Sequence, residues 1–436
     1  MTQQSMAHNG KTKDTGCRRN DPLTGLPATD EFLRRSNAFV AAHSDGPWCI
    51  IKLDVGHMTI FNEWYGKARG DELLAAVGAA LDALGDADWG VAGYWGQDDF
   101  LLLMAYDPVA IEQVYDDMRH VVASFDDSIG FLPAMGVYPL ATPAHVSIDE
   151  CSKAVYAARL AKRSYKDRVG YFKPAEYARH QREHTLLSRF QRALTEDRIE
   201  FYLQPQVNID TGQIVGAEAL ARWRAQDGTY VSPGEFIPVL EHSGFVASLD
   251  QYLWRRVITW LARRVAAGER VVPVSLNVSR VDIDSFDVAQ CVEQLLEQVS
   301  VPAHLVKFEI TESALAQDRE TVGALIARLK ALGCSVHMDD FGCGQSSLAM
   351  LRDVAVDAIK LDRSFLPTGG YRDDRAVDIM QSVAALSRSL GVPVVVEGVE
   401  TADQLALVRT LGLSYVQGYY YHRPMDPGAF EQLLAL

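Results

Sequence analysis

The second half of the chain repeats one short pattern, an apolar run followed by a helical segment, and this repetition limits the possible folds more than any other feature. From about residue 199 onward, several runs have the length and composition of buried strands. They are VVPVSLNVS (271–279), LVKFEIT (305–311), CSVHMDD (334–340), VDAIKLD (356–362) and GVPVVVEGV (391–399). Roughly 240 residues of repeated strand–helix units predict an α/β fold, and one (β/α)8 barrel accounts for them.

The first half follows a different pattern, in which short strands and amphipathic helices alternate irregularly. The run PWCIIKLDV (47–55) has the composition of a buried strand, and GVAGYWGQDDFLLLMAY (90–106) predicts two strands around a turn that begins at Gly96. Apolar residues at three- and four-residue spacing predict helices over 69–85 and from Ile111 to Val121. The mixture indicates an α+β domain with a mixed or antiparallel sheet.

The length of 436 residues exceeds that of one ordinary core, so two domains are expected. We predict a flexible tail over 1–20, an α+β domain over 21–172, a connecting helix over 173–198 and the barrel over 199–436. A formal net charge of −15 argues against a nucleic-acid polymer as a partner. No apolar run is long enough to cross a bilayer, so we expect no membrane insertion. Six scattered cysteines suit a reducing cytoplasm.

Polar residues stand near the carboxyl ends of the predicted barrel strands, which are otherwise apolar. In (β/α)8 barrels these ends meet at one mouth, where active sites lie. The residues are Asn277, Glu309, Asp339, Lys360, Glu397 and Gln417. Because they are separated by roughly one strand–helix unit each, we expect their side chains to converge on a common centre.

The adjacent Asp339 and Asp340, within VHMDDFGCG (336–344), raise the question of what holds two like charges together. Neighbouring carboxylates raise each other's pKa unless a positive group lies beside them. The surrounding donors are oxygens without a Cys and His cluster, so Mg²⁺ or Mn²⁺ fits better than zinc. Two such ions can cleave a phosphodiester. The aspartates could bind one ion each, or Asp339 could bridge both.

Two other interpretations of these residues stay open at this point. Asp340 could cap a following helix while Asp339 faces solvent. Alternatively, ion pairs between Lys360 and the surrounding acids could close the mouth without any metal.

Further motifs give the second half a resemblance to a known family. Glu218, Ala219 and Leu220 form the tripeptide EAL within GAEALARW. It occurs with LQPQV (203–207), FIPVLEHSG (236–244), LNVS, FEITES, DDFGCGQSSL, IKLDRSF, VEGVET and QGYYYHRP. On these motifs, residues 186–436 resemble the EAL family of cyclic di-GMP phosphodiesterases. The resemblance implies a barrel of TIM type, two divalent cations and hydrolysis of cyclic di-GMP to linear pGpG.

The resemblance also implies roles for residues at the matching positions. The implied metal ligands are Glu218, Asn277, Glu309, Asp339, Asp340 and Glu397. Lys360 and Glu397 would hold the nucleophilic water, and Glu218 belongs to the same catalytic set. The implied substrate contacts are Gln204, Arg222 and Gln417. Glu312 would brace the loop that follows Asp340.

That loop departs from the family pattern. Cys343 and Gln345 stand where Thr and Tyr are usual. In the family the loop couples dimerisation to metal binding, so the departures bear on regulation more than on chemistry. The resemblance implies a homodimer that forms through the barrel.

Residues 21–172, beginning with DPLTGLPATDEF, resemble the GGDEF family of diguanylate cyclases. The signature reads Gly96-Gln97-Asp98-Asp99-Phe100. Gln97 stands where a second glycine lets the turn approach the nucleotide phosphates. Gly56 and Thr59 replace a second Asp and a Lys of the family, and Ala87 and Gly90 replace the Arg and Asp of the inhibitory site. These losses imply that the domain has no cyclase activity.

Other positions of the cyclase family are retained. Asp54 and Asp98 match acidic positions of the family, whereas Asn62 and Asp71 match its guanine contacts. Their retention leaves a GTP-sensing role open. A domain kept only for folding and dimer contacts is the equal alternative.

Three functions compete on this sequence. The leading hypothesis is a metal-dependent cyclic di-GMP phosphodiesterase with a non-catalytic GGDEF-like domain. A catalytically silent cyclic di-GMP receptor that acts through a protein partner is disfavoured, because every expected ligand and Lys360 are retained. A bifunctional or cyclase-dominant protein is disfavoured by Gln97 and Gly56.

Overall fold

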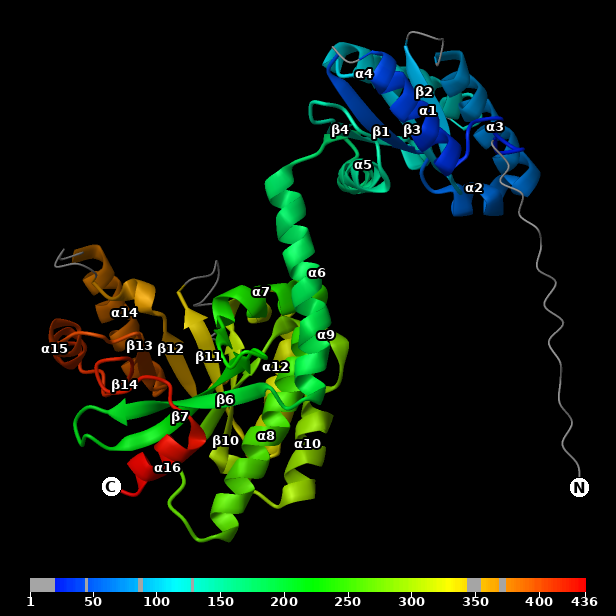
Figure 1. Cartoon of the computed structure of the whole chain (residues 1–436). Coiled ribbons are helices and arrows are strands. Elements are labelled where there is room, and N and C mark those ends of the chain that lie inside the picture. Colours follow the sequence, from blue (N-terminus) through cyan, green and yellow to red (C-terminus); the bar gives the residue numbers. More distant parts are fainter. Residues whose placement is uncertain (1–19, 44–45, 85–88, 127–128, 343–353, 368–373) are drawn as a thin grey trace, which may run out of the picture. The chain divides into compact units, whose positions relative to one another are not determined.

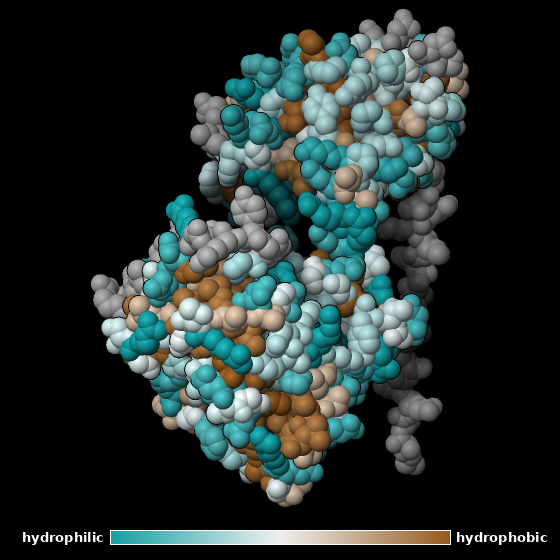
Figure 2. Space-filling model, turned by 90° about the vertical axis from the view of Figure 1, so that its left-hand side faces the viewer, coloured by the Kyte–Doolittle hydropathy of each residue, from teal (hydrophilic) through white to brown (hydrophobic). Residues whose placement is uncertain are grey.

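The computed structural model describes residues 20–43, 46–84, 89–126, 129–342, 354–367 and 374–436 (Figure 1). The chain divides into two compact units, residues 1–182 and 183–436. The predicted tail over 1–20 lies outside the described residues apart from Asn20. Figure 2 shows hydrophilic and neutral side chains over most of the visible face of each unit, with smaller apolar areas between them.

The first unit is built on a five-stranded sheet with the order β2-β3-β1-β4-β5. Its strands are β1 (Trp48–Asp54), β2 (Gly90–Gly96), β3 (Asp99–Ala105), β4 (Ala134–Pro139) and β5 (Val169–Tyr171). Strand β1 pairs antiparallel with β3 and β4, whereas β5 is parallel to β4. The predicted α+β domain with a mixed sheet is therefore confirmed, as is the β2–β3 hairpin.

Helices cover both faces of this sheet, and β1 is therefore buried at every position. Alternate side chains of β1 point to opposite faces. Ile51 packs in one apolar cluster with α3 and α4 residues, and Ile50 packs in another with α1 and α5 residues. The helices are α1 (Thr29–Ala42), α2 (Met58–Tyr65), α3 (Lys67–Leu84), α4 (Pro108–Ala123) and α5 (Ile148–Ala161), with a 3₁₀ turn at Ile129–Phe131.

The boundary between the two compact units falls within helix α6 (Pro174–Thr195), between Arg182 and Glu183. Its last turns carry the buried residues Leu186, Phe190 and Ala193, which belong to the barrel core. The predicted connecting segment, 173–198, covers this helix. The domain boundaries at its two ends stay a prediction.

The second unit is a closed barrel. Its sheet has the order β6-β14-β13-β12-β11-β10-β9-β7, and β6 pairs with β7 to close the ring, with β8 added to β7. The strands are β6 (Ile199–Asn208), β7 (Ile214–Arg224), β8 (Tyr230–Val231), β9 (Val274–Val278), β10 (Val306–Thr311), β11 (Ser335–Phe341), β12 (Ala358–Leu361), β13 (Val394–Glu397) and β14 (Tyr415–Gln417). The predicted TIM-type barrel is confirmed.

One strand departs from the all-parallel arrangement that a (β/α)8 barrel implies. Strand β6 runs antiparallel to both β7 and β14. The cause is local, because the side chain of Asn208 accepts hydrogen bonds from the backbone N–H groups of Asp210 and Thr211, and Gly212 has a φ of 69°. Such a tight turn reverses the chain within a few residues and leaves no room for a crossover helix.

The barrel helices begin where short polar side chains accept backbone N–H groups. The side chains of Ser279, Asp287, Thr401 and Asp426 cap α9, α10, α15 and α16 in this way. The helices are α7 (Pro233–Ser243), α8 (Val246–Ala266), α9 (Arg280–Ser285), α10 (Val288–Val299), α11 (Glu312–Gln317), α12 (Arg319–Ala331), α14 (Asp374–Leu390), α15 (Ala402–Thr410) and α16 (Pro427–Leu434), with 3₁₀ turns at Ala303–Leu305 and Arg363–Phe365. Among the described residues, no helix combines the length and apolar character that a membrane span requires.

Candidate active site

The side chain of Lys360, on β12, lies at the centre of the barrel mouth and is 1% exposed. Its Nζ atom is 2.6 Å from Glu309 Oε2 and 2.6 Å from Glu397 Oε1. It is also 3.2 Å from Glu218 Oε2 and 3.3 Å from Asp339 Oδ1. Four carboxylates from β7, β10, β11 and β13 therefore surround one buried ammonium group, and the predicted convergence of these residues is observed.

The pairing of the strands brings these side chains to one level. Glu309 on β10 is in register with Asn277 on β9, and Glu397 on β13 is in register with Gln417 on β14. Because all of these strands are parallel, their carboxyl ends meet at the same edge of the barrel. The alternation of strand residues turns the polar side chains inward and leaves Ile310 and Val396 in the surrounding core.

Amide side chains hold the carboxylate of Glu218. Gln417 Nε2 donates to Glu218 Oε2 over 2.6 Å, and Asn277 Nδ2 donates to Glu218 Oε1 over 3.3 Å. Gln417 Nε2 also donates to Gln204 Oε1 over 3.2 Å. The amides fix the orientation of Glu218, so its Oε2 atom faces Lys360.

The electrostatics of the cluster follow from burial and crowding. Burial raises the pKa of Glu309 well above its usual range, and the neighbouring acids add to this effect against the opposing charge of Lys360. Burial likewise raises the pKa of Glu397 to about 7. Burial alone would raise the pKa of Glu218. The charge of Lys360 and the amide hydrogen bonds together have the larger effect, so the pKa of Glu218 is lowered. Burial alone would lower the pKa of Lys360. The four carboxylates have the larger effect and hold its pKa well above the usual range. The lysine is therefore a permanent cation.

Asp340 lies at an irregular end of β11. Its φ is 54°, and the pairing of β11 with β12 shifts between Met338 and Phe341. This irregularity breaks the alternation that would turn consecutive side chains to opposite faces. Burial and the charge of Asp339 raise the pKa of Asp340. The proposed helix cap by Asp340 concerns residues beyond Gly342, which lie outside the described residues, as do Cys343 and Gln345.

Two further predicted residues lie beside the mouth. Glu312 Oε2 accepts a hydrogen bond of 2.9 Å from the backbone N–H of Gly342, directly after β11. The guanidinium of Arg222, half-buried on β7, lies 5.2 Å from the centre of the Tyr202 ring. Its Nη1 atom donates to the carbonyl of Ala221 over 2.8 Å, and within the part of the chain that the structure describes no carboxylate forms an ion pair with it.

A second polar layer, which was not predicted from the sequence, lies inside the barrel below the first. It comes two residues earlier on the parallel strands β9, β10 and β11, and two residues later on the antiparallel strand β6. Gln206 Nε2 donates to Gln417 Oε1 over 3.1 Å. Ser275, Lys307 and His337 precede Asn277, Glu309 and Asp339 by two positions. Ser275 Oγ and His337 Nδ1 are buried without a hydrogen-bond partner in the described structure. The period of two residues in a strand was the signal that could have found this layer.

In the first unit, Asp54 at the end of β1 is held by two lysines. Lys52 Nζ and Lys162 Nζ each lie 2.9 Å from its carboxylate, and the N–H of Gly56 donates to it over 2.8 Å. Burial raises the pKa of Asp54, but the lysines outweigh burial and lower it. Lys52 Nζ also lies 2.6 Å from Asp99 Oδ1. The structure thus joins Asp54 to the Asp99 of the signature turn.

The other retained residues of the first unit lie at two places, Asn62 and Asp71 on helices and Asp98 in the turn. Asn62, on α2, packs against Gly70, so it neighbours Asp71 on α3. The carbonyl of Asp98 accepts a hydrogen bond from Val55, which follows β1. Gln97 has a φ of 56°, in the left-handed region that favours glycine. The turn thus keeps a glycine-like backbone with a long side chain on it.

Comparison with known families decides the relationship of the chain. The family model of the EAL domain matches residues 187–424, more than half of the chain. The chain belongs to the EAL domain family. The model described as the diguanylate cyclase, GGDEF domain, matches residues 19–131, so a GGDEF domain and an EAL domain stand in tandem.

Named relatives of this GGDEF–EAL chain include phosphodiesterases. Cyclic di-GMP phosphodiesterase NbdA of Pseudomonas aeruginosa is 29% identical over 428 residues, which cover 95% of this chain and 54% of that protein. Bifunctional diguanylate cyclase/cyclic di-GMP phosphodiesterase MucR of the same organism is 28% identical over 434 residues, covering 95% and 61%. The solved PaMucR phosphodiesterase in complex with c-di-GMP is 27% identical with a TM-score of 0.54, covering 56% of this chain and 99% of that one. The chain spans about half the length of the first curated relatives it matches.

The residues of the EAL mouth fit divalent cations by their donor chemistry. The donors are carboxylate and amide oxygens, which suit hard divalent ions. Glu309 Oε1 is buried and has no hydrogen-bond partner in the described structure, so one lone pair of the innermost acid is free for a ligand. Within the described ranges no group of three or more His, Cys, Asp or Glu side chains is arranged as a metal site, and Lys360 Nζ lies between the acids.

Proposed function

We propose that the EAL domain hydrolyses cyclic di-GMP to linear pGpG in a reaction that depends on divalent cations. The observation that carries this proposal is the buried ammonium of Lys360 among Glu218, Glu309, Asp339 and Glu397 at the barrel mouth. The names of NbdA and MucR, together with the solved c-di-GMP complex of PaMucR, support the choice of substrate.

The proposed metal ligands are the oxygen donors at the strand ends. They are Glu218, Asn277, Glu309, Asp339, Asp340 and Glu397. When bound, two Mg²⁺ or Mn²⁺ ions would polarise the attacking water and stabilise the charge that develops on the phosphodiester. Burial, with the neighbouring acids adding to it, raises the pKa of Glu309 and brings that of Glu397 to about 7, and nearby positive charge would favour the ionised form of both.

Side chains at the mouth would position the attacking water and the substrate. Lys360 is a permanent cation, so it cannot act as a free-amine base, and it donates hydrogen bonds that hold the attacking water beside Glu397. The water oxygen would bond to phosphorus as one phosphorus–oxygen ester bond breaks. The water would lose one proton and the departing sugar oxygen would take one up through solvent, so the ring of the dinucleotide opens. Arg222 would face a phosphate of the substrate. Gln204 and Gln417 would complete the substrate site.

Glu312 is proposed to brace the segment after Asp340, because its carboxylate already accepts the N–H of Gly342. An ordered segment there would keep Asp340 at the mouth. Dimerisation through the barrel and a location in the cytoplasm remain predictions from the sequence.

The GGDEF domain is proposed to be non-catalytic. Its signature turn carries Gln97 in place of a glycine, and Lys52 and Lys162 already occupy the carboxylate of Asp54. It would either sense GTP, through Asp54, Asn62, Asp71 and Asp98, or serve folding and dimer contacts.

The test is hydrolysis of cyclic di-GMP by the purified chain with Mn²⁺ or Mg²⁺, followed by chromatographic detection of pGpG. We expect turnover that stops on chelation and returns when the metal is restored. Parallel reactions with GTP would show whether the GGDEF domain regulates the rate. Binding of cyclic di-GMP without cleavage under either metal would reject the phosphodiesterase and favour the receptor hypothesis.

A further inference from the structure

A cavity of about 660 Å³ opens in the first unit, away from the residues of the signature turn. It is lined by the end of β4, one face of α5 and the first turns of α6. Its volume lies in the range of about 300–1,000 Å³ that is typical of small-molecule sites. None of the functional roles assigned above uses this cavity.

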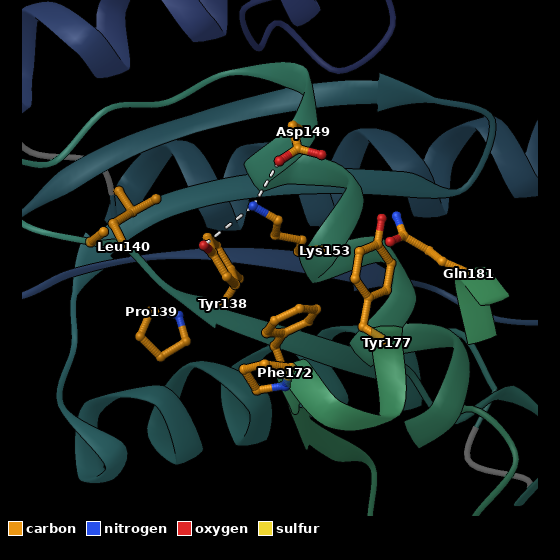
Figure 3. Close-up of a pocket in the computed structure, with 10 residues that line it drawn as sticks. Tyr138, Pro139, Leu140, Asp149, Lys153, Phe172, Tyr177 and Gln181 are labelled. Atoms are coloured by element: carbon orange, nitrogen blue, oxygen red, sulfur yellow. Dashed lines mark hydrogen bonds and ion pairs between the residues drawn. The ribbon is translucent and has the colours of Figure 1, made fainter. Parts of the chain in front are cut away.

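Three aromatic rings form its walls, as Figure 3 shows. The ring centres of Tyr138 and Phe172 are 5.0 Å apart at an interplanar angle of 87°, and those of Phe172 and Tyr177 are 5.2 Å apart at 60°. These contacts hold the rings in place, and each ring still contributes to the lining of the cavity. Rigid aromatic walls of this kind favour a flat ring as ligand.

Polar groups meet at one side of the cavity. Lys153 Nζ lies 2.7 Å from Asp149 Oδ2 and donates to the Tyr138 hydroxyl over 3.5 Å (Figure 3). The carboxylate of Asp149 is 64% exposed, and the Lys153 side chain is 20% exposed. An ammonium has three donors and a carboxylate about four acceptor positions, so both groups keep capacity for a ligand.

The charges at this side are balanced, which disfavours an anion. Lys153 Nζ faces Asp149 at 2.7 Å and Glu150 at 3.7 Å, so a phosphate would meet two carboxylates beside the one cation. A neutral ring that offers donors to the carboxylate and an acceptor to the ammonium matches the groups better. The Watson–Crick edge of guanine has two adjacent donors and one acceptor, whereas adenine has one donor.

We propose that this cavity binds a purine base, guanine in preference to adenine, with the ring packed against the aromatic walls and its polar edge on Asp149 and Lys153. Gln181, from the second turn of α6, lines the same cavity. Pro174, Tyr177 and Gln181 share one face of α6, so a bound base would contact that helix directly. The proposal is independent of the phosphodiesterase activity.

The test is calorimetric titration of the full chain with guanosine, adenosine and uridine. We expect guanosine to bind most tightly, adenosine about tenfold more weakly and uridine not measurably, because a pyrimidine offers less ring for stacking. Guanosine 5′-monophosphate should bind no more tightly than guanosine. Absence of guanosine binding at millimolar concentration, or equal binding of uridine, would overturn the proposal.

Substitutions in the cavity test whether guanosine binds there. Asp149→Asn keeps the shape of the side chain but removes its charge, and we expect about a tenfold loss of guanosine affinity. Tyr177→Leu should cause a similar loss by removing one wall. Asp116→Asn, on α4 with a half-exposed carboxylate, is the matched control and should leave the affinity unchanged. Guanosine binding that survives both cavity variants must lie elsewhere and would refute the assignment.

Discussion

The ammonium of Lys360 on β12 lies 2.6 Å from Glu309 Oε2 on β10, across the intervening strand β11. Both side chains are almost completely inaccessible to solvent. Burying a charge is costly unless a partner compensates it, so each of the two groups makes the ionised form of the other tolerable. This mutual dependence leads to the first prediction.

Lys360→Met should destabilise the barrel by about 3–5 kcal/mol in the absence of metal, because four carboxylates lose their shared cation. Urea unfolding of the chain with chelator measures this loss, and added Mn²⁺ should recover part of it. Lys330→Met is the control, since Lys330 pairs with Asp357 at a partly exposed site. It should cost less than about 1 kcal/mol. Equal stability of Lys360→Met and the parent would contradict the central role of the lysine.

Glu218→Gln should lower the turnover of cyclic di-GMP by at least about a hundredfold. The substitution keeps the size of the side chain but removes a carboxylate that Lys360, Asn277 and Gln417 all contact. Glu200→Gln is a matched control on the neighbouring strand β6, where Glu200 pairs with Arg224. The pGpG assay measures both variants. A parental rate for Glu218→Gln would sink the assigned site.

The stability of the barrel should fall as the pH rises above the acid range, because of a buried pair of acids that lies outside the Lys360 cluster. Burial raises the pKa of Asp250, on α8, well above its usual range, and the neighbouring carboxyl of Asp282 adds to this. Burial also raises the pKa of Asp282, which caps α9 through Ser279. Glu241, on α7, is the other acid that acts on Asp250.

The sign follows from linkage. A carboxyl whose pKa is higher in the folded chain than in the unfolded chain stabilises the fold below the unfolded value of about 3.9, and this contribution is lost as the pH rises through the folded value. Asp250→Asn should therefore raise the melting temperature at pH 8 and change it little at pH 4. Thermal unfolding across this range is the measurement. A larger gain at pH 4 than at pH 8 would show that the pair is not protonated in the folded chain.

Gln97→Gly should stabilise the GGDEF domain slightly, by up to about 1 kcal/mol, because glycine adopts the φ of 56° at this turn without steric cost. It should not restore a cyclase, since Gly56 and Thr59 still replace an acid and a lysine of the family. Calorimetry follows the stability, and incubation with GTP followed by chromatography tests for cyclic di-GMP. Formation of cyclic di-GMP by this variant or by the parent would refute a non-catalytic domain.

Much of the site was predictable because strands and barrels impose simple geometry. Residues at the carboxyl ends of parallel strands must meet, so Asn277, Glu309, Asp339, Lys360 and Glu397 could be grouped before any coordinates were known. The motifs around Glu218 then identified the family. The hairpin of β6 and β7 was missed, because the apolar run of a strand carries no direction, and only the turn at Asn208 and Gly212 reverses it.

The sequence by itself determined the two kinds of domain, the order of the strands along the chain and the residue types at the mouth, since these depend on local periodicity and spacing. Tertiary structure alone decided which oxygen faces which cation. It placed Lys360 between four acids, buried Asp250 against Asp282 and assembled the aromatic cavity of Tyr138, Phe172 and Tyr177. Burial and distance set these interactions, and both depend on segments that are far apart in sequence, so no local pattern encodes them.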